Sequence, residues 1–174
     1  HFIRAIIQNH GRDKLKEHGF SLHACVLRPE SRGWVKLKSS DPAMAPAINP
    51  NFLSDERDLH LLRDAARLMY RIAETPPLSD MGARDRSPID YNDDAALEAR
   101  IREVSDTIYH PVGTCRMGSD ADSVVDPKLK ARGVEGLWIA DASIMPRLVS
   151  GNTNAPSIMI GERAADFVKA ELAA

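Results

Sequence analysis

The sequence contains only two cysteines, Cys25 and Cys115, among its 174 residues. These two residues have neither the spacing of metal ligands nor the number needed for a disulfide framework, and they fit a protein of a reducing compartment. The histidines and carboxylates also show no metal-ligand spacing. We therefore expect no metal site, and we expect a cytoplasmic or membrane-peripheral location.

Long apolar runs and an excess of one charge are missing too. No apolar stretch reaches the roughly 18 residues that a membrane-spanning helix requires. The net charge is −2, with acidic and basic residues mixed along the chain, so the basic patches typical of nucleic-acid binding are lacking. Hydrophobic residues make up 43% of the sequence, which is enough for a buried core. The composition predicts a folded domain with no transmembrane segment and no nucleic-acid partner.

A further absence concerns glycine. No G-x-G-x-x-G motif follows a strand-like segment, so the phosphate-binding turn of a dinucleotide-binding fold is not in this sequence. The chain also begins at His1 rather than at Met. On these two grounds we expect the chain to be the C-terminal part of a longer protein, whose N-terminal dinucleotide-binding domain lies outside it.

The N-terminal third of the chain shows patterns of β-structure. Residues Phe2–His18 are compatible with a short helix or an irregular lead-in. Strand-length apolar patterns at Ser21–Arg28 and Arg32–Lys38, with Pro29-Glu30-Ser31 between them, predict a β-hairpin. Three prolines within Asp41–Asn51 predict an extended loop.

The rest of the chain is dominated by helical periodicity. Helices are predicted over Asp55–Glu74, with Asp55 as its cap, over Asp93–Ile108, and from Pro156 to about Leu172. A strand is predicted at Leu137–Asp141. The expected buried positions of the second and third helices are Leu97, Ile101, Val104, Ile108, Ile160, Ala164, Phe167 and Val168. We expect the apolar face of the last helix to need a partner from outside the chain.

Two loops near the C-terminus combine polar groups with turn residues. In the first, His110 precedes Pro111, which keeps the histidine out of helical geometry and places its imidazole on a defined turn. The second is Ser150–Ala155, just before the last helix, where Asn154 is predicted to cap the free N–H groups. A helix N-terminus at this point suits an anion or an electron-rich ring.

Three segments in this region resemble signatures of a known enzyme family. The sequences HPVGTCRMG, VVDPKLKARGVEGLWIADASIMP and GNTNAPSIMIGERAAD are similar to the C-terminal signatures of the glucose–methanol–choline (GMC) oxidoreductases, which are FAD-dependent enzymes that oxidise alcohols. A weaker similarity extends back to Arg28–Gly33, so the resemblance covers most of the chain. The motifs look most like those of the bacterial choline and aliphatic-alcohol dehydrogenases.

The resemblance implies an α+β fold made of parts of two domains. Residues 1–108 would belong to a substrate domain, built on an antiparallel sheet with flanking helices. Residues 109–174 would return to the α/β FAD-binding domain as a strand–loop–helix segment that completes it. The cleft between two such domains is a common place for ligands to bind.

The resemblance also implies roles for individual residues. His110 would be the general base that accepts the hydroxyl proton, while hydride passes from the alcohol carbon to flavin N5. Asn152, 42 positions later, would stabilise the developing alkoxide, since the family carries His or Asn there. The residues implied to contact FAD are Asp141 and Ala142, beside its ribityl and phosphate portion, Asn154, whose backbone would face its pyrimidine ring, and the neighbouring Thr153 and Ala155.

The implied partners are a small primary alcohol or choline-like substrate and an electron acceptor. A quinone or another carrier is favoured as acceptor, with oxygen as an alternative. Two other hypotheses stay open from the sequence. Cys115 and His110, five residues apart, could form a Cys/His hydrolase site, although no orienting Asn or Asp is implied. Alternatively, the chain could be a truncated or degenerate module that binds no cofactor and catalyses nothing.

Overall fold

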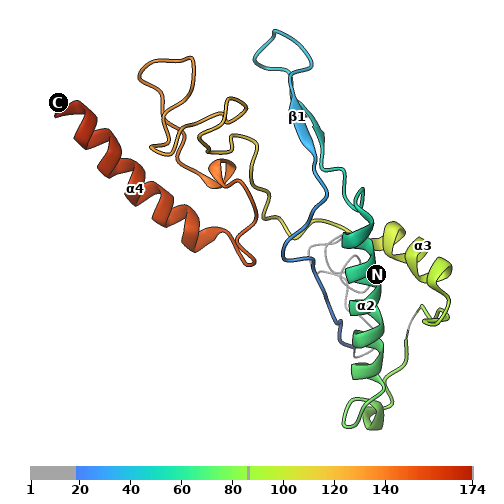
Figure 1. Ribbon diagram of the computed structural model, residues 1–174. Helices are drawn as coiled ribbons and strands as arrows, with labels where there is room; N and C mark the ends of the chain where they lie inside the picture. Colours follow the sequence, from blue (N-terminus) through green and yellow to red (C-terminus); the bar gives the residue numbers. More distant parts are fainter. Residues whose placement is uncertain (1–18, 86, 174) are drawn as a thin grey trace. The chain divides into compact units, whose positions relative to one another are not determined.

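The computed structural model describes residues 19–85 and 87–173 (Figure 1). The chain folds into two compact units, each of which is considered separately. Unit 1 contains the described residues up to Cys25 together with Leu59–Ser105, and unit 2 contains Val26–Asp58 and Asp106 onward. The lead-in expected over Phe2–His18 lies outside the described residues. The proposed division at residues 108/109 concerns the domains of a complete enzyme, and it stays a prediction.

Unit 1 is built on the long helix α2 (Glu56–Ala73), most of which belongs to it, and the helix α3 (Asp94–Val104), with the 3-10 turn η1 (Ser79–Met81) between them. The predicted cap of α2 is confirmed, because the Asp55 carboxylate accepts the Arg57 N–H at 3.0 Å.

Helix α3 ends four residues earlier than the sequence predicts. The Ser105 N–H still bonds to the Ile101 carbonyl, but Ser105 itself is extended. Beyond it, the side chains of Asp106 and Thr107 accept backbone N–H groups locally, which competes with continuation of the helix. Leu97 and Ile101 are buried as expected. Val104 and Ile108, at and beyond the end of the helix, are about half exposed.

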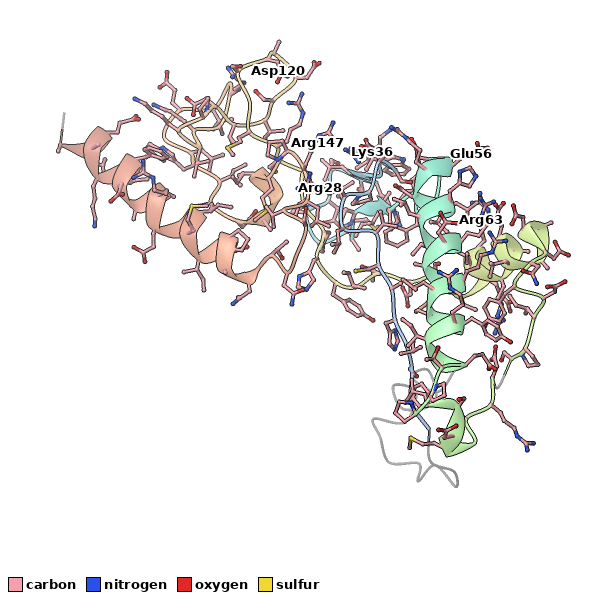
Figure 2. All side chains as sticks on the ribbon, turned by 60° about the horizontal axis from the view of Figure 1, so that its bottom comes forward. Arg28, Lys36, Glu56, Arg63, Asp120 and Arg147 are labelled. Carbon is pink, nitrogen blue, oxygen red and sulfur yellow. The ribbon has the colours of Figure 1, made fainter. Side chains whose placement is uncertain are left out.

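Ion pairs between α2 and α3 hold unit 1 together. Arg63 of α2, labelled in Figure 2, contacts the carboxylates of Glu98 at 2.7 Å and Asp94 at 2.9 Å. Arg67 contacts Asp94 as well and donates to the Tyr91 carbonyl at 2.8 Å. These contacts fix the first turn of α3 against the middle of α2.

Unit 2 contains a two-stranded antiparallel sheet of β1 (Trp34–Lys36) and β2 (Ala47–Asn49). The predicted hairpin is therefore wrong in its pairing, since Ser21–Arg28 forms no strand and the proline-rich segment supplies the partner. The three residues of β2 lie between Pro46 and Pro50, so each keeps its N–H. Gly33 permits the close approach, because a Cβ there would stand 2.2 Å from the Asn49 carbonyl oxygen.

The residues expected to form the hairpin turn bind the start of α2 instead. The N–H groups of Glu30 and Ser31 both donate to the Asp58 carboxylate, each at 2.9 Å, and Asp58 is 3% exposed. Burial alone would raise the pKa of Asp58, but hydrogen bonds from Ser31 and from the Glu30 N–H outweigh it and hold this pKa below its ordinary value.

The core of unit 2 lies under helix α4 (Asn154–Leu172). The expectation that α4 needs a partner from outside the chain is wrong, because its buried face packs on residues of the same unit. The predicted strand at Leu137–Asp141 is also wrong. It forms a single bridge, between Lys130 and Trp138, because the chain then turns into the 3-10 helix η2 (Ala142–Ile144). The buried cluster comprises Val125, Leu129, Ile144, Met145, Ile160 and Ala164, with Phe167 packed against it.

The small antiparallel sheet and the three α-helices found among residues 19–85 and 87–173 are consistent with the expected α+β class. Within the described part of the chain, no helix is both long and apolar enough to cross a membrane. Across the same residues, no group of three or more His, Cys, Asp or Glu side chains is placed to hold a metal ion.

Candidate active site

The loop that follows His110 is fastened to the backbone at η2. The Cys115 N–H donates to the Ser143 carbonyl at 3.0 Å, and the Met117 N–H donates to the Ile144 carbonyl at 2.8 Å. Ile144 is 1% exposed and belongs to the core under α4. The loop is thereby attached to the same core as the helix that begins at Asn154.

His110 contacts the loop that precedes α4. Its Nδ1 lies 3.1 Å from the Thr153 hydroxyl oxygen and 3.5 Å from the Thr153 backbone nitrogen. His110 is half-buried and Thr153 is 8% exposed. Nδ1 is thus engaged, and no contact within the described residues occupies Nε2. The sequence assigned Thr153 to the cofactor and missed this contact, because spacing alone cannot show which two loop residues meet.

Asn152, the predicted partner of His110, precedes Thr153 and is exposed. The structure therefore brings His110 to the loop that carries Asn152, although the direct hydrogen bond goes to Thr153. An exposed amide can serve as a donor to a small polar ligand.

The predicted capping role of Asn154 is wrong. Helix α4 begins at Asn154 itself, and the position before it is Thr153, whose side chain makes no capping hydrogen bond. Pro156 is then the third helical residue, where its missing N–H removes no helix bond. Thr153 is held by its carbonyl, which accepts from the Ser157 hydroxyl at 2.6 Å and from the Ser157 N–H at 3.0 Å.

The uncapped start of α4 fits the cofactor that the sequence predicts. The N–H groups of Asn154 and Ala155 have no acceptor in the described part of the chain, and both residues are exposed. A helix N-terminus with unpaired donors and a partial positive charge suits the electron-rich carbonyl end of a flavin ring. The residues present therefore fit FAD on this side.

Asp141 and Ala142 lie at the start of η2. The Asp141 carboxylate accepts the Ser143 N–H at 2.8 Å, so this side chain caps the 3-10 turn. Asp141 is exposed and Ala142 is half-buried. One carboxylate oxygen has a structural partner, while the exposed residue still presents a polar group to the surface. Their predicted contact with FAD stays a prediction.

Cys115 and Arg116 have roles in holding the loop. Cys115 is half-buried, and its backbone N–H bonds to Ser143. The Arg116 guanidinium forms two hydrogen bonds to the Asp120 carboxylate, at 2.9 and 2.7 Å. This contact holds the pKa of the Asp120 carboxyl well below its usual range. Neither residue contacts His110 in the described structure, and nothing here assembles a thiol–imidazole pair.

Two surface hollows lie outside the predicted site residues. In unit 2, Arg28 Nε donates to the Ser150 hydroxyl at 2.6 Å, and Arg147 pairs with Glu30 at 3.5 Å; Figure 2 labels both arginines. These contacts brace the segment that leads to Asn152.

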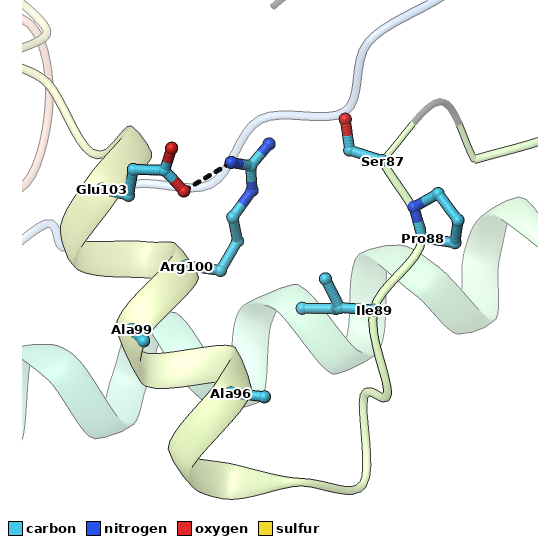
Figure 3. A pocket seen from close by; sticks show the side chains of 7 residues that line it. All are labelled: Ser87, Pro88, Ile89, Ala96, Ala99, Arg100 and Glu103. Atoms are coloured by element: carbon cyan, nitrogen blue, oxygen red, sulfur yellow. Dashed lines mark hydrogen bonds and ion pairs between the residues drawn. The ribbon is translucent and has the colours of Figure 1, made fainter.

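The hollow of unit 1 contains no predicted site residue, and Figure 3 shows the Arg100–Glu103 ion pair on its wall. Its lining consists of Ser87, Pro88, Ile89, Ala96, Ala99, Arg100 and Glu103.

Comparison with known proteins gives consistent matches. A family model described as GMC oxidoreductase matches residues 29–161. The alcohol dehydrogenase [acceptor] of Pseudomonas putida is 44% identical over 169 residues, covering 97% of this chain and 31% of the relative. An oxygen-dependent choline dehydrogenase of Klebsiella pneumoniae is 44% identical over 170 residues, with the same coverage. The chain thus spans about a third of the length of these relatives.

A solved structure agrees with the sequence relatives. An R554A variant of formate oxidase from Aspergillus oryzae RIB40, solved to study the effect of the mutation on FAD modification, matches with a TM-score of 0.78. Its sequence identity is 31%, and the match covers 84% of this chain and 26% of that structure.

Proposed function

Because the chain belongs to the GMC oxidoreductase family, we propose that it forms the C-terminal part of an enzyme that oxidises the CH–OH group of an alcohol. The proposed substrate is a primary alcohol or a choline-like compound, in keeping with the names of the relatives. The observation that carries the proposal is the approach of His110 to the loop of Asn152 and Thr153. Residues 1–108 are assigned to the substrate domain, and residues 109–174 to the FAD domain.

The enzymes of this family are FAD-dependent, and FAD bound at this site supplies the acceptor for the hydride of the alcohol carbon. We assign its pyrimidine end to the start of α4, with the N–H groups of Asn154 and Ala155 as the donors and Thr153 next to them in the chain. Asp141 and Ala142 would border its ribityl and phosphate portion. The support for the first assignment is the pair of exposed N–H donors at the uncapped helix start.

His110 is the proposed general base. Its Nε2 has no partner among the described residues, so this nitrogen can accept the proton of the substrate hydroxyl. The exposed Asn152 amide would donate to the oxygen as negative charge develops on it. A donor that bonds more strongly to an alkoxide than to an alcohol lowers the barrier rather than merely binding the substrate.

The proposed electron acceptor is a quinone or another carrier, with oxygen as the competing candidate. The Pseudomonas relative is named for an unspecified acceptor, and the Klebsiella relative is named as oxygen-dependent. Reoxidation of the reduced enzyme by a soluble quinone and by oxygen, compared in separate anaerobic and aerobic mixing experiments, decides between them.

The test of the proposal uses the flavin-loaded enzyme that contains this chain, called the holoenzyme below. Anaerobic mixing with choline and with a series of primary alcohols should bleach the flavin absorption, with an aldehyde as the product. A purified enzyme with a flavin spectrum that none of these compounds reduces would refute the substrate class. Loss of activity with a thiol reagent, in a protein without any flavin spectrum, would support the Cys/His hydrolase instead.

A further inference from the structure

The segment that leads to Asn152 contains a strained residue. Ser150 has a φ of +66°, in the left-handed region that L side chains rarely adopt. Its side chain makes one hydrogen bond within the described part of the chain, in which Arg28 Nε donates to the hydroxyl at 2.6 Å. A strained backbone conformation persists only where the surrounding contacts hold it. The bond from Arg28 is therefore the contact to consider first as the cause of this conformation.

Close packing does not hold the segment at this point. Residues 147–150 form one wall of a hollow of about 420 Å³, and residues 28–30 form the other. Two polar contacts bridge these segments, the bond from Arg28 to Ser150 and the pair of Arg147 with Glu30 at 3.5 Å. The Arg147 side chain is 73% exposed, and exposed ion pairs stabilise little. The short bond from Arg28 is thus the main contact of the segment across the hollow.

Asn152 has no contact that fixes it directly. Neither Gly151 nor Asn152 makes a hydrogen bond to any residue that the structure describes, and both are exposed. The next residue, Thr153, is fixed by the two bonds of its carbonyl to Ser157. Asn152 therefore lies between two fixed points, Ser150 on one side and Thr153 on the other. The direction of its amide depends on the backbone conformation at both.

We propose that Arg28 is a positioning residue, whose Nε–H holds Ser150 in the left-handed conformation and thereby sets the direction in which the chain presents the Asn152 amide. The inference rests on the proposed function, in which this amide donates to the developing alkoxide. Without the bond, Ser150 relaxes to an ordinary negative φ and the chain is redirected at Gly151. A displaced donor stabilises the transition state less than a well-placed one.

The first test is kinetic and uses the holoenzyme. Arg28→Met keeps an unbranched side chain but removes the donor, and it should slow flavin reduction by about 10-fold, and by no more than Asn152→Ala does. Substrate affinity should change less than the rate, because the amide acts mainly on the developing charge. Ser150→Ala should show the same loss, since alanine keeps the strain without the hydroxyl. Arg71→Met, which replaces an exposed arginine of α2, is the control and should leave the rate unchanged.

Glycine at position 150 separates an effect on conformation from an effect of charge. Because glycine adopts a positive φ without strain, Ser150→Gly should keep most of the rate although the hydroxyl is gone. Adding Arg28→Met to Ser150→Gly should then cost nothing further. If Arg28→Met slows the Ser150→Gly enzyme as much as the wild type, the guanidinium acts in another way and the proposal is wrong.

A double-mutant cycle with Asn152 tests whether Arg28 acts through this amide. In the Asn152→Ala background, Arg28→Met should add little to the loss, because the group that it positions is already absent. Equal slowing in the two backgrounds would overturn the proposal, since a general structural effect is independent of Asn152.

Hydrogen exchange followed by mass spectrometry separates this inference from the proposed function. Peptides that cover residues 150–153 should exchange faster in Arg28→Met than in wild type, and at the wild-type rate in Arg71→Met. If Asn152→Ala reduces flavin at the normal rate, the proposed role of Asn152 fails, and faster exchange in Arg28→Met still supports its hold on Ser150. If Asn152→Ala is slow but Arg28→Met changes neither the rate nor the exchange, the inference about Arg28 is wrong.

Discussion

Gly113 lies against the backbone of Met145, in the loop that carries His110. Its φ is +90°, a conformation that L side chains rarely adopt, and a Cβ at this position would stand 3.3 Å from the Met145 carbonyl oxygen. Met145 is 4% exposed and belongs to the core under α4. The glycine therefore permits both the turn after His110 and its close packing on η2.

Gly113→Ala should destabilise the chain by about 2 kcal/mol, from backbone strain and the tight contact. Thermal unfolding followed by circular dichroism should show a midpoint lower by about 4–8 °C. The matched control is Gly161→Ala in α4, where φ is not positive and nothing lies within 4 Å of the added Cβ. That change should stabilise the helix by about 0.5–1 kcal/mol, and equal midpoints for the two variants would contradict the prediction.

Asp58→Ala should cost about 2–4 kcal/mol of stability. The N–H groups of the half-buried Glu30 and Ser31 lose their shared acceptor, the buried Asp58 carboxylate, and an unsatisfied buried donor costs about 1–3 kcal/mol. Asp64→Ala, an exposed aspartate of the same helix, serves as control and should change stability by less than about 0.5 kcal/mol. Urea titrations of the two variants measure the difference.

The same carboxylate predicts a dependence of stability on pH. The pKa of Asp58 in the folded chain lies below its ordinary value of 3.8, so the unfolded chain binds the proton more readily. The stabilisation is fully present above the ordinary value and is lost as pH falls through the lowered one. Asp58→Ala should flatten this part of the acid unfolding curve, and an unchanged curve would show that other carboxylates produce it.

His110→Ala in the holoenzyme should slow flavin reduction by roughly 10²–10⁴, the usual scale of general-base catalysis. Fold and FAD content should be retained, because one side chain of the loop contributes little to cofactor binding. Wild-type activity should fall in acid, since a protonated imidazole cannot accept the hydroxyl proton, and the variant should lack this acid limb. Rapid mixing across a pH series measures both effects, with the exposed His60→Ala as control.

Asn152→Ala should slow turnover less than His110→Ala, because the amide supplies one hydrogen bond to the reacting oxygen, worth about 1–3 kcal/mol. Asn152→His should keep part of the activity, since an imidazole can donate the same bond. Asn92→Ala replaces an exposed amide in a turn of unit 1 and should have no effect on the rate. A loss at Asn152 as large as that at His110 would mean that its role is misassigned.

The 174-residue chain expressed by itself should neither retain FAD nor oxidise alcohols. It spans about a third of its relatives' length and contains no G-x-G-x-x-G turn, so we expect it to supply only part of the FAD site. Its helix α4 should nevertheless be folded, because the buried face packs on the chain's own core. Equilibrium dialysis against FAD tests the first statement, and stoichiometric binding would refute it.

Much of the local structure could be predicted from the sequence. Asp55 caps α2 as expected, and Leu97 and Ile101 face inward, because capping and helical periodicity depend on residues within one or two turns. The resemblance of the segments around His110 and Asn152 likewise indicated the family that the comparisons show. Short-range patterns were sufficient for these conclusions.

Long-range pairing was decided only by the tertiary structure. The sequence predicted Ser21–Arg28 as the partner of β1, but the folded chain uses Ala47–Asn49. Gly33 allows that strand to approach closely. The N–H groups of Glu30 and Ser31, expected in the hairpin turn, bind Asp58 instead. Pairing energies depend on which segments the whole fold brings together, and local propensity does not contain that information.

The contact of His110 with Thr153 was likewise decided only by the tertiary structure. The sequence identified both loops, and it assigned the polar residues of each to chemistry or to the cofactor. Which side chain meets the imidazole depends on where α4 begins, and the helix begins at Asn154, two residues before the proline that suggested its start. The register of that first turn places the Thr153 hydroxyl on Nδ1, because α4 and the His110 loop are both packed on the core around Ile144.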